Sequence, residues 1–156
     1  MKRVITLLLL CMALLSSCAG SFKDIRMTSY DIVSITPKGL SSVDAVIDLG
    51  IDNPAMGFTL TDIKGVARLN DEPCLLISAD DMKIEGRSEK EYRLLVHGVL
   101  GENFNPFQLL TLLKNTDLSQ IKVDASARAE LGYGIGKTIE IKDKGLDKLL
   151  KDGLSL

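Results

Sequence analysis

The chain has little of what metal and nucleophilic sites are built from. Its 156 residues include one histidine, three cysteines and no tryptophan. His97 stands alone, and the sequence contains neither Cys-x-x-Cys nor His-x-x-x-His, the ligand spacings typical of zinc sites. A Ser-His-Asp arrangement built on His97 would need an acid and a serine that the sequence does not single out. We therefore expect no enzyme activity, no catalytic residue, no metal and no cofactor.

Positive charge is scarce as well. The 19 lysines and arginines are outnumbered by 21 aspartates and glutamates, which leaves a net charge of −2. Proteins that bind nucleic acid concentrate positive charge on one surface. The composition therefore argues against a nucleic-acid partner.

A long apolar run occurs only at the start of the chain. Lys2 and Arg3 precede the apolar segment 4–15, which is too short to span a bilayer comfortably and has the order of a secretory signal. The box Leu15-Ser16-Ser17-Cys18 that ends it resembles the signal of bacterial lipoproteins. The resemblance implies that residues 1–17 are a signal peptide that is removed, and that Cys18 becomes the lipid-attachment site.

The same resemblance implies where the protein resides. Inner-membrane lipoproteins typically carry Asp after the cysteine, whereas this chain has Ala19, so we expect the outer membrane of the cell envelope, facing the periplasm. The domain would be anchored through its lipid rather than spanning the membrane. An ordinary secretory signal and an uncleaved anchor are the alternatives. Once the leader is removed and Cys18 is modified, Cys74 has no disulfide partner, and we expect it to be a buried structural thiol.

Strand-like alternation dominates residues 22–100. The clearest run places Val43, Ala45, Ile47, Leu49 and Ile51 on one face, with aspartates on the other. The pair Asn53-Pro54 follows as a structural turn, because proline lacks a ladder donor and asparagine readily closes turns. Further short strands follow, and 70–72 is predicted to be the tip of a hairpin.

The periodicity changes once. Asn105 before Pro106 is typical of a helix start, and leucines recur at helical spacing up to residue 115, so we predict one helix over 106–115. A strand from 121 to 131 has small inward residues, and the helix is predicted to fill the space opposite them. After a glycine-rich turn at 132–136, a last strand covers 138–142. The sequence therefore predicts a mainly β fold, an immunoglobulin- or fibronectin III-like antiparallel β-sandwich of about seven strands with one inserted helix.

Part of this pattern resembles a known family. The strand and turn Val46-Ile47-Asp48-Leu49-Gly50-Ile51-Asp52-Asn53-Pro54, the segment 60–69 with its polar tip, and Gly86-Arg87-Ser88-Glu89 before the next strand resemble the late embryogenesis abundant (LEA) type 2 family, the water-stress and hypersensitive-response domain. Ala55 departs from the polar residue that family members often have there. The resemblance implies a tether over 18–29, a LEA type 2-like domain over 30–156, and a non-enzymatic role in stress response or in contact with lipid.

These features favour a binding protein of the envelope, whose partner is the membrane through its lipid anchor and also an envelope protein or a lipid. The candidate apolar ligand groove lies beneath the helix and is lined by Phe104, Phe107, Leu110 and Leu113. The simpler interpretation is that these side chains only close the core. The alternative function is a periplasmic hydrolase with an unidentified active site on loops. The Gly-Lys-Thr at 136–138 is not predicted to bind phosphate, because Leu131 stands where that loop needs glycine and a strand follows.

Overall fold

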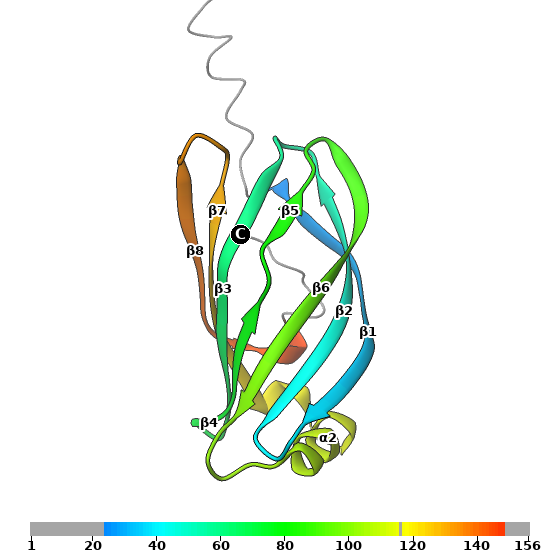
Figure 1. Cartoon of the computed structure of the whole chain (residues 1–156), viewed down its shortest axis with the longest axis vertical. Coiled ribbons are helices and arrows are strands. Elements are labelled where there is room, and N and C mark those ends of the chain that lie inside the picture. Colours follow the sequence, from blue (N-terminus) through cyan, green and yellow to red (C-terminus); the bar gives the residue numbers. More distant parts are fainter. Residues whose placement is uncertain (1–23, 116, 149–156) are drawn as a thin grey trace, which may run out of the picture.

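A computed structural model describes residues 24–115 and 117–148 (Figure 1). The predicted signal peptide, Cys18 and the first part of the predicted tether lie outside these residues. The elements are β1 (Arg26–Lys38), β2 (Ser42–Asn53), β3 (Phe58–Leu69), β4 (Glu72–Ala79), β5 (Met82–Ile84), β6 (Ser88–Leu100), α2 (Pro106–Asn115), a 3₁₀ turn (Leu118–Gln120), β7 (Ile121–Glu130) and β8 (Gly136–Gly145).

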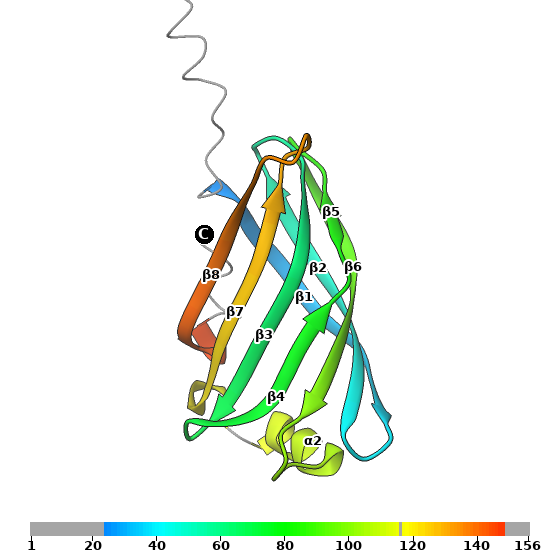
Figure 2. The same cartoon turned by 60° about the vertical axis from the view of Figure 1, so that its left-hand side comes forward.

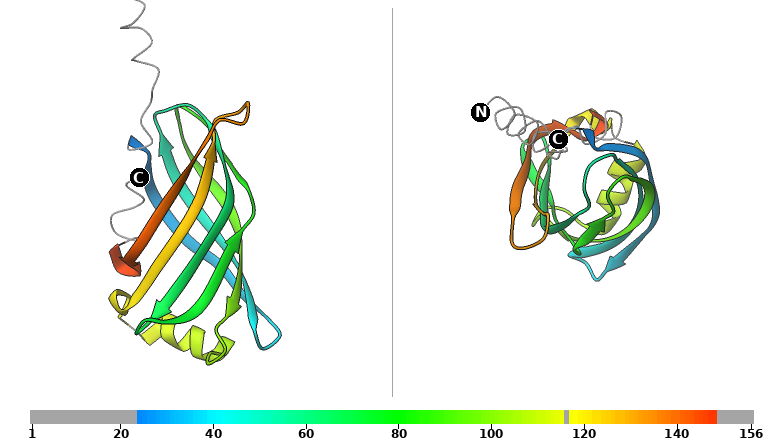
Figure 3. Two further views of the ribbon diagram at one scale, coloured as in Figure 1. Left: turned by 90° about the vertical axis from the view of Figure 1, so that its left-hand side faces the viewer. Right: turned by 90° about the horizontal axis from the view of Figure 1, so that it is seen from above.

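The fold is mainly β and antiparallel, as predicted. Eight strands form one sheet in the order β1-β2-β6-β4-β3-β7-β8, with β5 pairing β3 beyond the end of β4. Every pairing in it is antiparallel. The sheet curls strongly, so that its two halves face each other as the layers of a sandwich do (Figures 2 and 3). The two layers are thus halves of one continuous sheet whose edge strands are β1 and β8.

The structure has one strand more than the sequence predicted, because β1 was not recognised as a separate strand. This edge strand is exposed along most of its length, and its pairing with β2 shifts register between Met27 and Ser29 and again between Ile32 and Ser34. Each bulge adds a residue and reverses which face the following side chains occupy. The predicted tether is also too long, since β1 begins at Arg26, and Arg26, Met27 and Ser29 pair with β2.

The predicted turn after β2 is built around Asn53, which is completely buried. Its side-chain Nδ2 donates hydrogen bonds to the carbonyls of Met56 at 3.1 Å and Glu85 at 3.0 Å, and its Oδ1 accepts one from the Ala55 N–H at 3.0 Å. Three partners satisfy the amide without water. Asn53 and Pro54 therefore form the structural turn that the sequence predicted.

Helix α2 occupies the predicted residues and lies across the lower end of the curl (Figures 1 and 2). Its start is a reciprocal cap: the Gln108 N–H donates to Asn105 Oδ1 and the Asn105 N–H donates to Gln108 Oε1, both at 2.9 Å. Near the chain end, Leu146–Lys148 are helical. None of the helices in the described ranges is long and apolar enough to cross a bilayer.

Candidate functional site

Strand register determines which side chains point into the curl. Val43 and Ile51 of β2 are buried, which confirms the core face predicted for this strand. Successive residues of a strand alternate between faces, and directly paired residues share one. The inner face of the β2–β6 pair therefore includes Ala45 with Val96, Ile47 with Leu94, and Leu49 with Tyr92.

Buried side chains gather at the two ends of this inner face. We call the first cluster the upper core; it comprises Ile25, Ile51, Phe58, Met82, Ile84 and Ala129. We call the second the lower core; it comprises Val43, Ala67, Cys74, Leu100, Ile121 and Val123. Cys74 is the buried thiol that the sequence predicted: its Sγ lies 3.3 Å from the Ala67 carbonyl, and burial raises its pKa.

Between the two cores the inner face is only partly covered. We call this region the apolar middle; it comprises Ala45, Ile47, Ile77, Val96, Ala125 and Ala127, all half-buried. Each points inward by its register, and none carries a polar side-chain atom. An ordinary domain core would be most buried at its centre, so the interior of this sheet is apolar but accessible.

Both edge strands of the sheet carry apolar side chains on the inner face. Tyr30 and Ile32 of β1 share a face with inward residues of β2, yet they remain 43% and 48% exposed. On the opposite edge, Ile139 and Ile141 of β8 point inward and are half-buried. β1 and β8 are not hydrogen bonded to each other (Figure 3). No hydrogen-bonded strand pairing therefore closes the inner face between these two edges.

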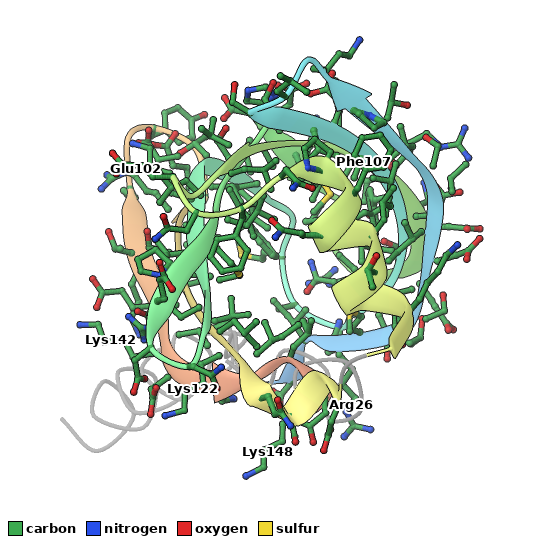
Figure 4. All side chains as sticks on the ribbon, turned by 90° about the horizontal axis from the view of Figure 1, so that it is seen from below. Arg26, Glu102, Phe107, Lys122, Lys142 and Lys148 are labelled. Atoms are coloured by element: carbon green, nitrogen blue, oxygen red, sulfur yellow. The ribbon has the colours of Figure 1, made fainter. Side chains whose placement is uncertain are left out.

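The groove predicted beneath the helix is not assembled as expected. Phe104 is half-buried and packs against the lower core, and Leu110 is half-buried. Phe107, by contrast, is 73% exposed on α2 (Figure 4), and the side chain of Leu113 lies outside the described part of the chain. The helix itself lies across the end of the sheet rather than alongside β7 (Figure 2).

A row of polar residues crosses the outer face. Asp44 of β2 pairs with His97 of β6, His97 with Ser78 of β4, and Ser78 with Lys64 of β3. His97 lies on the face opposite Leu94 and Val96. Its Nδ1 is 2.7 Å from Asp44 Oδ1, and this hydrogen bond, helped by Lys38 at 3.7 Å, holds the pKa of Asp44 below its usual range. The sequence could not predict this row, because its residues are far apart along the chain. They become neighbours only through the order of β2, β6, β4 and β3 in the sheet.

This row has part of the geometry of a nucleophilic site. Asp44 orients the imidazole of His97, and Ser78 is the next residue along the row. In the described chain, however, no hydrogen bond joins Ser78 Oγ to His97, and the backbone of β4 is paired on both sides, which leaves few donors for an oxyanion. Within the same residues, no group of three or more His, Cys, Asp or Glu side chains could hold a metal ion.

A shallow groove of about 690 Å³ lies beside the row on the outer face of β4, β3, β7 and β8. Its apolar floor includes Val66 and Leu76. The Asp124 carboxylate accepts the N–H of Asp143 at 2.7 Å and pairs with Arg68 at 2.6 Å, and these contacts hold the pKa of Asp124 below its usual range. The charges that border the groove are thus largely neutralised by one another.

The glycine-rich segment is the hairpin between β7 and β8. Gly132, Tyr133 and Gly134 have positive φ angles of 95°, 53° and 75°, and the Leu131 N–H donates to the Ile135 carbonyl at 2.8 Å. Lys137 and Thr138 lie in β8, not at a helix N-terminus. The strand predicted after the glycines is thus confirmed, and the Gly-Lys-Thr sequence does not begin a helix.

Comparison with known proteins gives structural similarity alone. No family model matches the chain, and no curated protein matches its sequence. A crystal structure of a protein from Archaeoglobus fulgidus is 12% identical, with a TM-score of 0.46, and the match covers 76% of this chain and 98% of that one. The GAE domain of yeast GGA1 is also 12% identical, with a TM-score of 0.34, and the match covers 76% and 96%.

Proposed function

We propose that this protein is a lipoprotein of the bacterial envelope that works by binding, with a LEA type 2-like domain and no enzymatic activity. Cys18 carries the lipid and holds the domain at the periplasmic face of the outer membrane, where it contacts a lipid or an envelope protein and takes part in stress protection. The lipoprotein box at 15–18 supports the anchor. Eight residues lead from Cys18 to the start of β1 at Arg26, so the tether reaches roughly 28 Å.

One observation carries the binding role: the apolar middle of the inner face is half-buried between two buried cores. Apolar surface left accessible inside a fold is unfavourable unless something covers it. An interior of this kind suits a hydrophobic ligand. The short tether would keep that interior close to a bilayer, which is the natural source of such ligands.

The anchor is tested by counting free thiols and by measuring the mass of the mature N-terminal peptide. If residues 1–17 are removed and Cys18 is acylated, the unfolded protein from envelope membranes has one free thiol, that of Cys74, and an N-terminal peptide with the mass of a lipidated cysteine. Cys18→Ala should release the protein from the membrane without changing its thermal stability. A mature chain with an intact leader and an unmodified Cys18 would refute the anchor.

A hydrolase is the second candidate, and the 2.7 Å contact between His97 and Asp44 beside Ser78 is what favours it. In that case Ser78 Oγ would attack an ester carbonyl while His97 takes its proton. His97 would pass that proton to the departing alcohol as the C–O bond breaks, and water would then release the acyl group from Ser78. Purified protein should then hydrolyse a short-chain p-nitrophenyl ester, and both Ser78→Ala and His97→Ala should abolish the activity. Turnover at the background rate, or turnover that survives both changes, excludes this site.

A further inference from the structure

We infer that the apolar middle is a binding site for one unbranched acyl chain of a lipid, which enters between β1 and β8. The inference rests on the proposed binding role, and it names the ligand class and the route. It does not depend on the anchor, because the inner face is formed by strands that all lie within residues 26–145.

The dimensions of the inner face suit a single chain. On β2, Val43 of the lower core and Ile51 of the upper core are eight residues apart, or roughly 26 Å of extended strand. An acyl chain in one leaflet occupies about half of the 30 Å hydrocarbon core, or about 15 Å. The half-buried residues Ala45, Ile47 and Leu49 lie between Val43 and Ile51 and offer contacts along that length.

The chemistry of the apolar middle suits a hydrocarbon rather than a polar ligand. Its side chains are two isoleucines, one valine and three alanines. The aspartates of β2 and the arginine and histidine of β6 alternate with them and therefore face outward, where Asp48 pairs with Arg93 and Asp44 with His97. A peptide would leave its backbone groups without partners on such a surface, whereas an acyl chain has none to satisfy.

The small side chains of β7 provide the room. Ala125 and Ala127 face inward, opposite Ile141 and Ile139 of the neighbouring strand. Both alanines remain half-buried. A longer side chain here would occupy volume that the acyl chain needs, which makes Ala127 the position at which to block the site.

The absence of tryptophan from the chain permits a direct test of location. Leu94 and Leu95 are adjacent in β6 and point to opposite faces: Leu94 packs against the upper core, and Leu95 is 48% exposed on the outside. Leu94→Trp and Leu95→Trp each introduce a single indole. A stearic acid brominated at mid-chain quenches an indole only at close range, so it reports which face holds the chain. The protein used is the whole mature polypeptide, 18–156, made without its leader so that it carries no lipid of its own.

We expect the brominated acid to quench the Leu94→Trp protein saturably, at one acid per protein, and to leave the Leu95→Trp protein unquenched. Ala127→Phe should lower the affinity by about ten- to a hundredfold, the equivalent of two or three methylene contacts. Ser126→Phe places the same ring on the outer face of the same strand and should have no effect. Thermal unfolding of each variant identifies any that fail to fold, and the two tryptophan variants then decide the matter without Ala127→Phe.

Equal quenching of both tryptophans, or no saturable quenching of the inner one, would overturn the inference. So would an unchanged affinity in a folded Ala127→Phe protein. These outcomes are distinct from failure of the proposed function. A protein that is lipidated at Cys18 but does not bind the acid would still be an envelope lipoprotein, with its binding surface elsewhere.

Discussion

The side-chain amide of Asn53 donates a 3.0 Å hydrogen bond to the backbone carbonyl of Glu85, 32 residues further along the chain. The same carbonyl accepts a hydrogen bond from Ser88 Oγ at 3.1 Å, and the Glu85 N–H donates to the hydroxyl of Tyr92 at 2.9 Å. One residue after β5 is thereby tied to the end of β2 and to β6. This connection closes the upper end of the curled sheet beside the upper core.

Asn53→Ala should be strongly destabilising. The change removes three hydrogen bonds and leaves the carbonyls of Met56 and Glu85 and the N–H of Ala55 without their partner in a buried turn. Unsatisfied buried groups of this kind cost about 1–3 kcal/mol each, and with partial relaxation we expect a loss of about 2–4 kcal/mol in the free energy of unfolding. Urea denaturation measures it. Asn103→Ala, at an exposed asparagine, should change stability by less than about 0.5 kcal/mol; similar losses in both variants would contradict the prediction.

Ile84 is the largest apolar side chain that is completely buried in the described chain, and it lies in the upper core. Ile84→Val should cost about 0.5–1.5 kcal/mol and Ile84→Ala about 2–5 kcal/mol, because the cavity adds to the lost transfer energy. Leu76→Ala on the outer face removes a leucine that is 49% exposed and should cost far less. If the two alanine variants were equally destabilised, the upper core would not be the rigid end that the burial pattern indicates.

The cap at Asn105 can be tested in the same way. Asn105→Ala removes the acceptor for the Gln108 N–H and should reduce stability by about 1 kcal/mol, whereas Asn105→Asp and Asn105→Ser retain an acceptor and should cost only a few tenths. Chemical denaturation of the three variants gives the comparison. Equal losses would indicate that α2 is stabilised by packing alone and not by its first turn.

Local patterns predicted the parts of the fold that depend on neighbouring residues. The helix over 106–115 follows from Asn105, Pro106 and leucine spacing, and the core face of β2 follows from strict alternation between Val43 and Ile51. The Asn53 turn was recognised from two residues, although its three hydrogen-bond partners, among them Glu85, could not be. Each of these features is set within a few residues of chain.

The candidate site depends on contacts that are distant in sequence, so it could not be predicted. The bulges near Thr28 and Val33 reverse the alternation of β1, so the sequence pattern of this segment does not indicate a strand. The row of His97 and Ser78 exists only because β6 lies between β2 and β4. The apolar middle is brought together by the curl of the whole sheet. The small residues of β7 were the one sequence signal for this region. The sequence analysis placed α2 opposite them, whereas α2 lies across the end of the sheet.

The ionised form of Asp124 should contribute to stability in a pH-dependent way. Its carboxylate accepts the N–H of Asp143 at 2.7 Å, and Arg68 lies 2.6 Å away; these contacts, the backbone hydrogen bond first, lower its pKa in the folded state. The stabilisation is therefore fully present above the ordinary pKa of an aspartate and is lost as the pH falls through the lowered value.

Asp124→Asn keeps the size of the side chain and removes its charge, so it should be less stable than the wild-type protein at neutral pH. The two stabilities should converge as the solution becomes acidic enough to protonate Asp124 in the folded wild type. Arg68→Gln leaves the backbone hydrogen bond in place and should give a smaller gap that closes over the same acidic range. Urea denaturation of the three proteins from neutral to strongly acidic pH measures both gaps. A gap that stays constant with pH would mean that the amide acts through packing, and that the charge of Asp124 does not stabilise the junction of β7 and β8.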